Sequence, residues 1–156
     1  MSREAAPVDV PEVAGVTIRG YRESDADEVI RVNAAAFAHH PEQGSMDAGN
    51  LAERMAEPWF DPAGLVVADA GDRLLAFHWT KQHSPALGEV YVVAVDPAAQ
   101  GRGLGKAVTA AGLAHLTARG VDRIILYVES DNAPAIATYS TLRFVHTSTH
   151  VQYERR

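Results

Sequence analysis

Apolar and polar residues alternate along the chain in short blocks that predict strands separated by helices. The pattern predicts strands at residues 16–19, 64–68, 74–80, 89–95, 122–128 and 144–153, and helices at 24–37, 47–55, 104–119 and 132–142. The strands within 64–80 flank Asp69-Ala70-Gly71-Asp72, which is typical of a hairpin turn. Residues 1–15 contain two prolines and show no period, so we expect a flexible tail or linker there.

The order of these elements, β-α-α-β-β-β-α-β-α-β, predicts one α/β (α+β) domain over residues 16–156. Three consecutive strands in the middle argue against a purely parallel, doubly wound sheet. We therefore expect a mixed, mostly antiparallel sheet flanked by helices. Helix ends carry matching signals, with Ser24 at an N-cap, Gly120 as a C-terminal stop, and Asn132 capping a helix that has Pro134 in its first turn.

Composition narrows the class of protein further. The chain has 156 residues, of which 47% are hydrophobic and 22% charged, as in an ordinary soluble domain. It has no cysteine, which excludes disulfides, a thiolate metal site and a cysteine nucleophile. A formal net charge of −6 disfavours binding to nucleic acid. The chain shows neither a signal-peptide pattern nor an apolar run of bilayer length, so we expect a cytoplasmic protein without a membrane partner.

A glycine-rich turn separates the strongest predicted strand from the longest predicted helix. Its residues are Gln100, Gly101, Arg102, Gly103, Leu104, Gly105 and Lys106. Glycine lets the backbone approach a ligand closely, and a helix N-terminus presents free N–H groups to an anion. Arg102 and Lys106 add positive charge in an otherwise acidic chain. The turn therefore predicts an anion site of the kind that holds a pyrophosphate.

Three phosphate-binding patterns compete for this turn. A dinucleotide fingerprint needs glycine at Lys106, and a P-loop needs glycine at Gln100 and Ser or Thr at Ala107, so both patterns fail. The remaining pattern is Gln-x-x-Gly-x-Gly after a strand that ends in Val-Asp-Pro. It resembles the coenzyme A loop of the GNAT acetyltransferase superfamily, and the resemblance extends over nearly all of residues 16–153.

This resemblance implies a GNAT fold, whose fourth strand is bulged and splays from the fifth, leaving a V that holds acetyl-CoA. The cofactor-binding residues that it implies are Val93, Ala94, Val95, Gln100, Gly101, Arg102, Gly103, Leu104, Gly105, Lys106 and Asn132. Backbone groups of Val93 and Val95 would pair with the pantetheine arm, and the turn would hold the pyrophosphate. The tyrosine that faces the departing sulfur in this family matches Tyr139, seven residues after Asn132.

Longer segments resemble one group within the superfamily more closely. Residues 39–44, 59–62, 77–81, 88–92 and 126–132 look like the C-terminal, catalytic half of the mycothiol synthase family. Enzymes of that family acetylate the cysteinyl amine of a glucosaminyl-inositol thiol, and their substrate contacts match Glu42, Lys81, Glu89 and Tyr127. There are two departures. The family carries a second GNAT-like domain before this one, and its Leu-Gly-Phe is replaced here by Leu142-Arg143-Phe144.

Acetyl transfer to an amine needs a base, a polarised carbonyl, and a proton or hydrogen bond for the leaving thiolate. Glu89 begins the cofactor strand and is the candidate general base, acting through a water. The backbone N–H of Val95, or of a neighbour at the bulge, is the candidate donor to the carbonyl oxygen. Tyr139 is the candidate acid, because the pKa of a phenol is close enough to that of a thiol. Structural roles stay open, with Glu89 as a solvated carboxylate and Tyr139 as a core side chain.

The remaining polar candidates have two interpretations each. Glu42 suits an ammonium or sugar hydroxyls but is equally compatible with a carboxylate at a helix end. Lys81 suits the same ligand or an ordinary solvated lysine. The seven histidines suggest a metal, but no His-x-x-x-His pair lies on a predicted helix and the chain has no cysteine, so we expect no metal.

The resemblance thus implies an acetyl-CoA-dependent N-acetyltransferase of mycothiol biosynthesis that acts on a small-molecule amine. Two alternatives stay open. One is a GNAT acetyltransferase for another small amine, such as an amino sugar or amino acid. The other is an inactive acetyl-CoA-binding domain that supports a partner. The protein partners considered are a second copy of this chain and a preceding GNAT-like domain.

Overall fold

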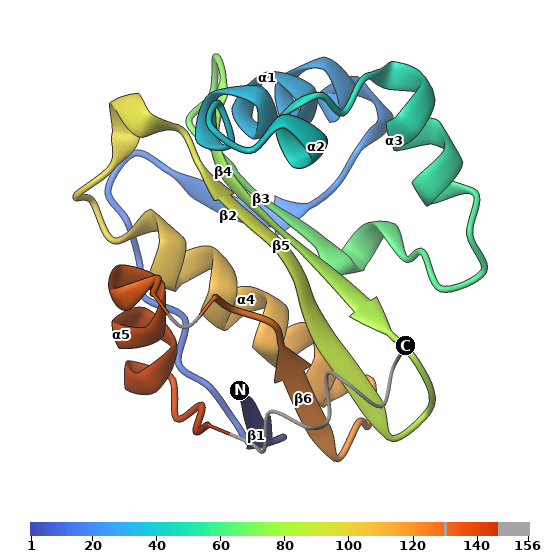
Figure 1. Ribbon diagram of the computed structural model, residues 1–156, viewed down its shortest axis with the longest axis vertical. Coiled ribbons are helices and arrows are strands. Elements are labelled where there is room, and N and C mark those ends of the chain that lie inside the picture. The colour runs from blue at the N-terminus through green and yellow to red at the C-terminus, as the bar shows by residue number, and fades with distance from the viewer. Residues whose placement is uncertain (130, 147–156) are drawn as a thin grey trace.

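A six-stranded sheet forms the centre of the molecule, with helices on both of its faces (Figure 1). The computed structural model describes residues 1–129 and 131–146. The strands are β1 (Ser2–Glu4), β2 (Thr17–Gly20), β3 (Leu65–Asp69), β4 (Leu74–Gln82), β5 (Leu87–Val95) and β6 (Arg123–Leu126). The helices are α1 (Ala26–Ala36), α2 (Pro41–Gly44), α3 (Ala48–Met55), α4 (Leu104–Ala118) and α5 (Ala133–Thr141).

The order of strands across the sheet is β1-β6-β5-β4-β3-β2. Every neighbouring pair is antiparallel except β5 and β6, which are parallel and are joined by a connection that contains α4. The predicted mixed, mostly antiparallel sheet is therefore confirmed. The predicted hairpin is also confirmed, since β3 and β4 pair directly and Gly71 in their turn has a φ of 100°.

Strands β5 and β6 run together only over the first part of β5. Their paired residues end at Val90 and Leu126, while β5 continues to Val95 (Figure 1). On the other side of β5, Trp79 of β4 pairs with Val92 and Thr80 pairs with Val90, so Tyr91 is an extra residue in a β-bulge. The predicted bulge and splay of the cofactor strand are both present.

Residues of β5 alternate between two layers of helices. A Cβ placed on Gly88 would lie 3.0 Å from the side chain of Leu116 in α4, so Gly88 faces α4. Because successive side chains of a strand point to opposite faces, Glu89 faces away from α4, toward the side of the sheet that α1, α2 and α3 cover.

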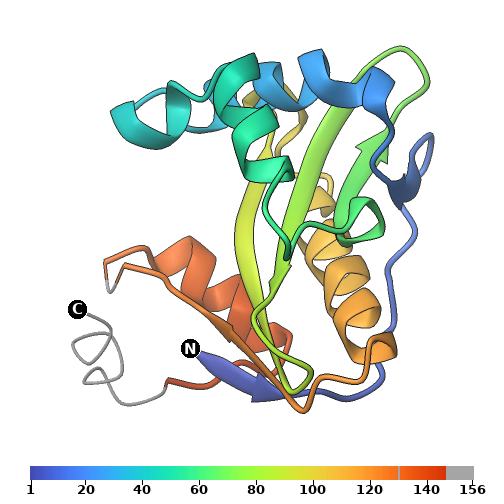
Figure 2. The same ribbon diagram turned by 90° about the vertical axis from the view of Figure 1, so that its right-hand side faces the viewer.

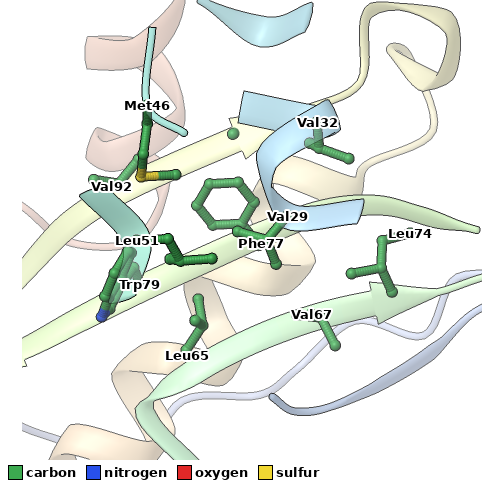
Figure 3. Packing of buried hydrophobic residues seen from close by; sticks show 11 residues of the cluster. Val29, Val32, Met46, Leu51, Leu65, Val67, Leu74, Phe77, Trp79 and Val92 are labelled. Carbon is green, nitrogen blue, oxygen red and sulfur yellow. The ribbon is translucent and has the colours of Figure 1, made fainter. Parts of the chain in front are cut away.

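A hydrophobic core lies between the sheet and this α1–α3 layer. Phe77 and Trp79 of β4 are buried there, packed among Val29 and Val32 of α1 and Leu51 of α3 (Figure 3). Their burial holds the α1–α3 layer against the sheet, and this layer supplies one wall of the site described below.

His78 lies between these two aromatic residues in sequence and faces α4 on the opposite side of the sheet. Its side chain is fully buried, and its Nδ1 donates to the carbonyl oxygen of Val108 over 3.0 Å. A Cβ on Gly112 would collide with the imidazole ring, so this turn of α4 accepts only glycine. Burial lowers the pKa of His78 to about 4, so the ring is neutral near pH 7.

Residues 2–4 depart from the prediction of a flexible tail. They form β1, which pairs antiparallel with β6, and Arg3 donates to the carbonyl oxygen of Leu142 over 2.8 Å. Met1, Ser2 and Arg3 are buried. A three-residue strand is too short to show a period in the sequence. Its stability comes from the free edge of β6, which lies more than a hundred residues away in the chain.

Four smaller differences concern short elements and the ends of longer ones. Ser24, the expected N-cap, lies inside a short 3-10 helix at Glu23–Asp25, and Asp25 is the N-cap of α1. Residues 41–44 form the short helix α2, where a break was expected. The predicted loop at 81–88 is shorter, because β4 extends to Gln82 and β5 begins at Leu87. Of the predicted strand at 144–153, residues 147–153 lie outside the described residues. Its start is represented by Val145, which forms an isolated bridge with Ser2.

Candidate functional site

A cleft of about 920 Å³ opens where β5 and β6 diverge. It is bounded by β5, by the segment that follows β6, by α5 and by the α1–α2 region. Figure 2 shows α2 in the upper part of the view and α5 in the lower part, and residues of both helices line the cleft. The lining residues include Val93, Ala94, Val95, Gln100, Gly105, Tyr127, Asn132 and Tyr139, all of which were predicted as site residues. The structure thus brings together residues that are up to 46 positions apart in the printed numbering.

The glycine-rich turn, predicted to bind the cofactor, lies beside the cleft and contributes Gln100 and Gly105 to its lining. Gly101 and Gly103 have φ values of 84° and 77°, and a Cβ on either would meet no atom within 4 Å. Glycine is therefore needed for the backbone conformation there rather than for lack of space. The first N–H groups of α4 follow directly, as an anion site requires.

Not every residue of the predicted turn lines the cleft. Gly101, Arg102, Gly103, Leu104 and Lys106 lie outside the lining, and the Leu104 side chain is buried in the core. The guanidinium of Arg102 donates to the carbonyl oxygen of Ala14 over 3.2 Å. The exposed side chain of Lys106 stays near the same helix end, so its predicted role remains a prediction.

A buried carboxylate anchors the strand that leads into this turn. Asp96 accepts hydrogen bonds from Arg31 and Arg73, each over 2.8 Å, and from the N–H of Ala98 over 3.0 Å. The hydrogen bond from Arg31 is the main cause that lowers the pKa of Asp96, and the bond from Ala98 adds to it. Sequence analysis noted Asp96 only as part of Val-Asp-Pro and missed both arginines, whose approach depends on α1 and on the β3–β4 hairpin.

Asn132 and Tyr139 lie on one side of the cleft, on α5. The Oδ1 of Asn132 accepts the N–H of Ala135 over 3.3 Å, which confirms its predicted role as N-cap. The Tyr139 ring packs edge-on against Phe144 at 5.8 Å, and the residue also lines the cleft. Burial raises the pKa of Tyr139, so the phenol holds its proton more firmly than an exposed one.

The predicted substrate residues come from α2, β4, β5 and the segment after β6. Lys81 and Glu89 are cross-strand partners, and Glu89 is only 7% exposed. Neither side chain lines the cleft, whereas Tyr127 does. Glu42 is exposed on α2 and also lies outside the lining, although its neighbours His40 and Gln43 belong to it.

Lys81 is held by aromatic rings. Its Nζ lies 4.9 Å from the ring centre of Trp59 and 5.5 Å from that of Tyr91. A cation over an aromatic face is stabilised by the ring quadrupole. The arrangement restricts the ammonium group without neutralising it.

Phe37, His40, Gln43 and Thr109 also line the cleft, and none of them was predicted as a site residue. The side-chain amide of the buried Asn33 donates to the backbone carbonyl oxygen of Gln43, and the side-chain amide of Gln43 donates to Oδ1 of Asn33. In the sequence, the one signal for the contact between Asn33 and Gln43 is that Asn33 is a polar residue on an otherwise apolar helix face. Its partner could not be identified because α2 was not predicted.

Residues 1–129 and 131–146 show neither a metal-binding cluster nor a membrane-spanning helix. In that part of the chain, no group of three or more histidine, aspartate or glutamate side chains could hold a metal ion. In the same part, none of the helices combines the length and apolar character needed to traverse a bilayer.

Comparisons with known proteins agree with this geometry. Residues 32–144 match the family described as "Acetyltransferase (GNAT) family". A relative named mycothiol acetyltransferase from Nocardioides sp. (strain ATCC BAA-499 / JS614) is 62% identical, over 90% of this chain and 54% of its own length. A relative of the same name from Rhodococcus opacus (strain B4) is 53% identical, over 99% of this chain and 55% of its own length. The chain therefore spans about half the length of the curated relatives it matches.

Solved structures share the fold. The ribosomal-protein-S18-alanine N-acetyltransferase from Escherichia coli matches with a TM-score of 0.71 and 25% identity, covering 85% of this chain and 79% of that one. The PaiA N-acetyltransferase from Thermoplasma acidophilum, solved in complex with coenzyme A, matches with a TM-score of 0.65 and 15% identity, covering 81% and 87%. The splayed strands, the glycine turn before α4 and the family match lead to one conclusion: this chain belongs to the GNAT acetyltransferase family.

Proposed function

We propose that this chain is an acetyl-CoA-dependent N-acetyltransferase that acetylates the cysteinyl amine of a glucosaminyl-inositol thiol. The observation that carries the proposal is the cleft between β5 and β6, with an open strand edge, a glycine turn and Tyr139 around it. The names of the relatives support the substrate class. Because those relatives are about twice as long, the acceptor and the activity of the whole protein belong to the proposal.

The residues around the cleft fit acetyl-CoA. Among the described residues, β5 has no strand partner beyond Val90 on its β6 side, so its backbone groups can pair with the pantetheine arm. The space around Gly101 and Gly103 is open where the pyrophosphate would lie. When bound, acetyl-CoA supplies the acetyl group as a thioester.

Glu89 accepts a proton from the ammonium group of the acceptor in this proposal. Its carboxylate is buried and faces the α1–α3 layer, outside the lining of the cleft. A water between the carboxylate and the amine therefore fits the geometry better than direct contact. The neutral amine can then attack the acetyl group.

Two donors act on the other side of the reaction. The backbone N–H of Val95, or of a neighbour at the bulge, donates to the carbonyl oxygen of the bound acetyl group. The Tyr139 hydroxyl donates its proton to the departing sulfur. Because burial raises the pKa of Tyr139, the phenol is protonated and available as a donor at neutral pH.

Glu42, Lys81 and Tyr127 would hold the hydroxyl groups of the acceptor. Lysine and phenol groups donate to sugar oxygens, and a carboxylate accepts from hydroxyls or from an ammonium. No structural observation favours the two alternatives, a different small amine or an inactive acetyl-CoA-binding domain. A cytoplasmic location, a homodimer, and a preceding GNAT-like domain are further parts of the proposal.

The test is acetyl transfer from acetyl-CoA to a panel of amines. The panel contains cysteinyl-glucosaminyl-inositol, an amino sugar, an amino acid and an arylalkylamine. We expect the highest kcat/KM for the first, a large loss in Glu89→Gln, and little change in the control Glu53→Gln on the exposed side of α3. Equal rates for all amines would contradict the acceptor class, and no transfer to any would contradict the enzymatic activity.

A further inference from the structure

A short hydrogen bond links the candidate base to a histidine that the proposed mechanism does not use. The Nε2 of His83 lies 2.6 Å from the Oε1 of Glu89. The Glu89 side chain is 10% exposed and that of His83 is 26% exposed. His83 comes from the turn between β4 and β5, directly beside the strand end that holds Glu89.

The position of Glu89 in the sheet would favour an ion pair with Lys81 rather than a bond to His83. Lys81 is the cross-strand partner of Glu89, so both side chains leave the sheet on the same face. Opposite charges in such positions commonly pair, yet among the described residues no ion pair joins Lys81 to Glu89. Lys81 lies over Trp59 and Tyr91, while Glu89 binds His83.

The other neighbours of Glu89 do not compete with His83. On β6 the residue paired with Glu89 is Ile125, which is apolar. Arg54 of α3 reaches the same face, but its guanidinium lies 6.0 Å from the ring centre of Tyr91. In the described part of the chain, His83 is the side chain that hydrogen-bonds the Glu89 carboxylate.

We propose that His83 is a positioning residue for Glu89: it donates its Nε2–H to Oε1 and leaves Oε2 free to take the proton of the acceptor amine. The inference rests on the proposed function of Glu89. A buried carboxylate needs a hydrogen-bond donor to satisfy its oxygens and to fix its orientation. With one oxygen engaged by the imidazole, the carboxylate has a single orientation, and Lys81 stays available for the acceptor.

No covalent change at His83 is required. The amine loses one proton, which passes through the bridging water to Oε2, while the Nε2–H bond to Oε1 is kept. This role predicts that His83 affects the rate of acetyl transfer and leaves acetyl-CoA binding unchanged, because the cofactor end of the cleft lies farther along β5.

The experiment compares His83→Ala, His83→Gln and Gln82→Ala. The amide of glutamine can place a donor where Nε2 stands, so His83→Gln is the conservative variant. Gln82 is the matched control, since it precedes His83 in the chain but faces α4, where it accepts from Arg119 over 3.2 Å. The measured quantities are kcat, KM for the acceptor, the dissociation constant of acetyl-CoA, and the ¹H and ¹⁵N NMR signals of the His83 ring.

We expect His83→Ala to lower kcat about tenfold, the loss of one hydrogen bond to a charged group. His83→Gln should recover most of that loss, and Gln82→Ala should behave like wild type. Acetyl-CoA affinity should change less than about twofold in all three variants. A general structural defect would instead lower the acetyl-CoA affinity together with kcat. In wild type, the Nε2 proton should resonate downfield and should move upfield in Glu89→Gln.

Wild-type kcat in His83→Ala, or an equal loss in His83→Gln, would overturn the proposal. The NMR signals provide a test that needs no turnover. If wild type acetylates none of the amines, the proposed function fails, while a downfield Nε2 proton sensitive to Glu89→Gln would still support the contact. If His83→Ala does not fold, His83→Gln and the NMR signals decide. Absence of the Nε2 proton signature would overturn the positioning role.

Discussion

The two ends of the cleft are built in different ways. The expected cofactor end comes mainly from one stretch of chain, residues 93–106, and the start of α5; from that stretch Val93, Ala94, Val95, Gln100 and Gly105 line the cleft. The proposed acceptor residues Glu42, Lys81, Glu89 and Tyr127 come from α2, from the neighbouring strands β4 and β5, and from the segment after β6, and of these four Tyr127 lines the cleft. One end is therefore a local feature of the chain, and the other depends on the whole sheet.

The two ends also differ in whether backbone or side-chain groups form the site. At the cofactor end the turn offers backbone N–H groups, and the required feature is the left-handed backbone of Gly101 and Gly103. At the acceptor end the contacts are between side chains, in the His83–Glu89 bond and the stacking of Lys81 on Trp59. Changes of backbone conformation should damage the first, and changes of single side chains should damage the second.

The largest effect is expected in the sheet that supports both ends. Burial lowers the pKa of His78 from 6.5 to about 4. Below pH 6.5 the unfolded chain takes up a proton that the folded protein refuses, so the free energy of unfolding falls between pH 6.5 and 4. The loss is about 3 kcal/mol in total. Urea unfolding at a series of pH values measures this loss of stability. Acetyl-CoA binding and acetyl transfer should be lost together as the protein unfolds.

The variant His78→Leu isolates this contribution. It should be less stable than wild type at pH 7, because the bond to Val108 is lost, but its stability should depend less on pH between 6.5 and 4. His39→Leu, at an exposed position, should keep the wild-type dependence. Identical pH profiles for wild type and His78→Leu would contradict the assignment.

A substitution in the turn should separate the cofactor end from the acceptor end. Gly103→Glu forces a side chain into a φ of 77° and places a negative charge where the pyrophosphate would bind. We expect acetyl-CoA affinity to fall at least about a hundredfold, measured by calorimetry. Gly71→Glu, in a hairpin turn with a φ of 100°, carries similar strain away from the cleft and should bind normally.

Tyr139→Phe should lower kcat about tenfold or more, as expected when one proton donor is lost. Acetyl-CoA affinity should stay near wild type, because the ring that packs against Phe144 is retained. Steady-state kinetics at saturating concentrations of both substrates gives the answer. Tyr21→Phe, a tyrosine in the α1–α3 core, serves as the control. If both variants turned over at the wild-type rate, Tyr139 would have no role as an acid.

The smallest effect is expected at Lys81. Lys81→Met keeps much of the packing on Trp59 and Tyr91 but removes the donor, so KM for the acceptor should rise roughly fivefold. Lys106→Met is the matching variant at the proposed cofactor end, and it should instead lower the affinity for acetyl-CoA. If each lysine affected both substrates alike, the division of the cleft into two ends would be wrong.

Much of the fold was predictable from periodicity and capping signals. The strands around the hairpin, the long helix before Gly120 and the capped helix after Asn132 all match the structure closely. Short elements were not predictable: β1 is stabilised by the edge of β6, and α2 is tied to α1 through Asn33 and Gln43. Neither has a local pattern strong enough to indicate it.

The site shows the same division. The glycine turn could be found from its own residues, because its conformation depends on which positions lack a Cβ. His83 could not be connected with Glu89 by any spacing rule, since a six-residue separation has meaning only after β4 and β5 are paired. The arginines that hold Asp96 come from α1 and from the β3–β4 hairpin and were hidden for the same reason.

By itself, the sequence determined most of the longer elements, the turn that opens α4 and the cap at Asn132, because these depend on interactions between residues close in the chain. Only the tertiary structure decided how far β5 and β6 stay paired, which face Glu89 takes, and which side chains bind it. Strand register and bulges set these features. A shift of one residue moves every side chain to the opposite face, and the choice among registers is made by packing of the whole sheet.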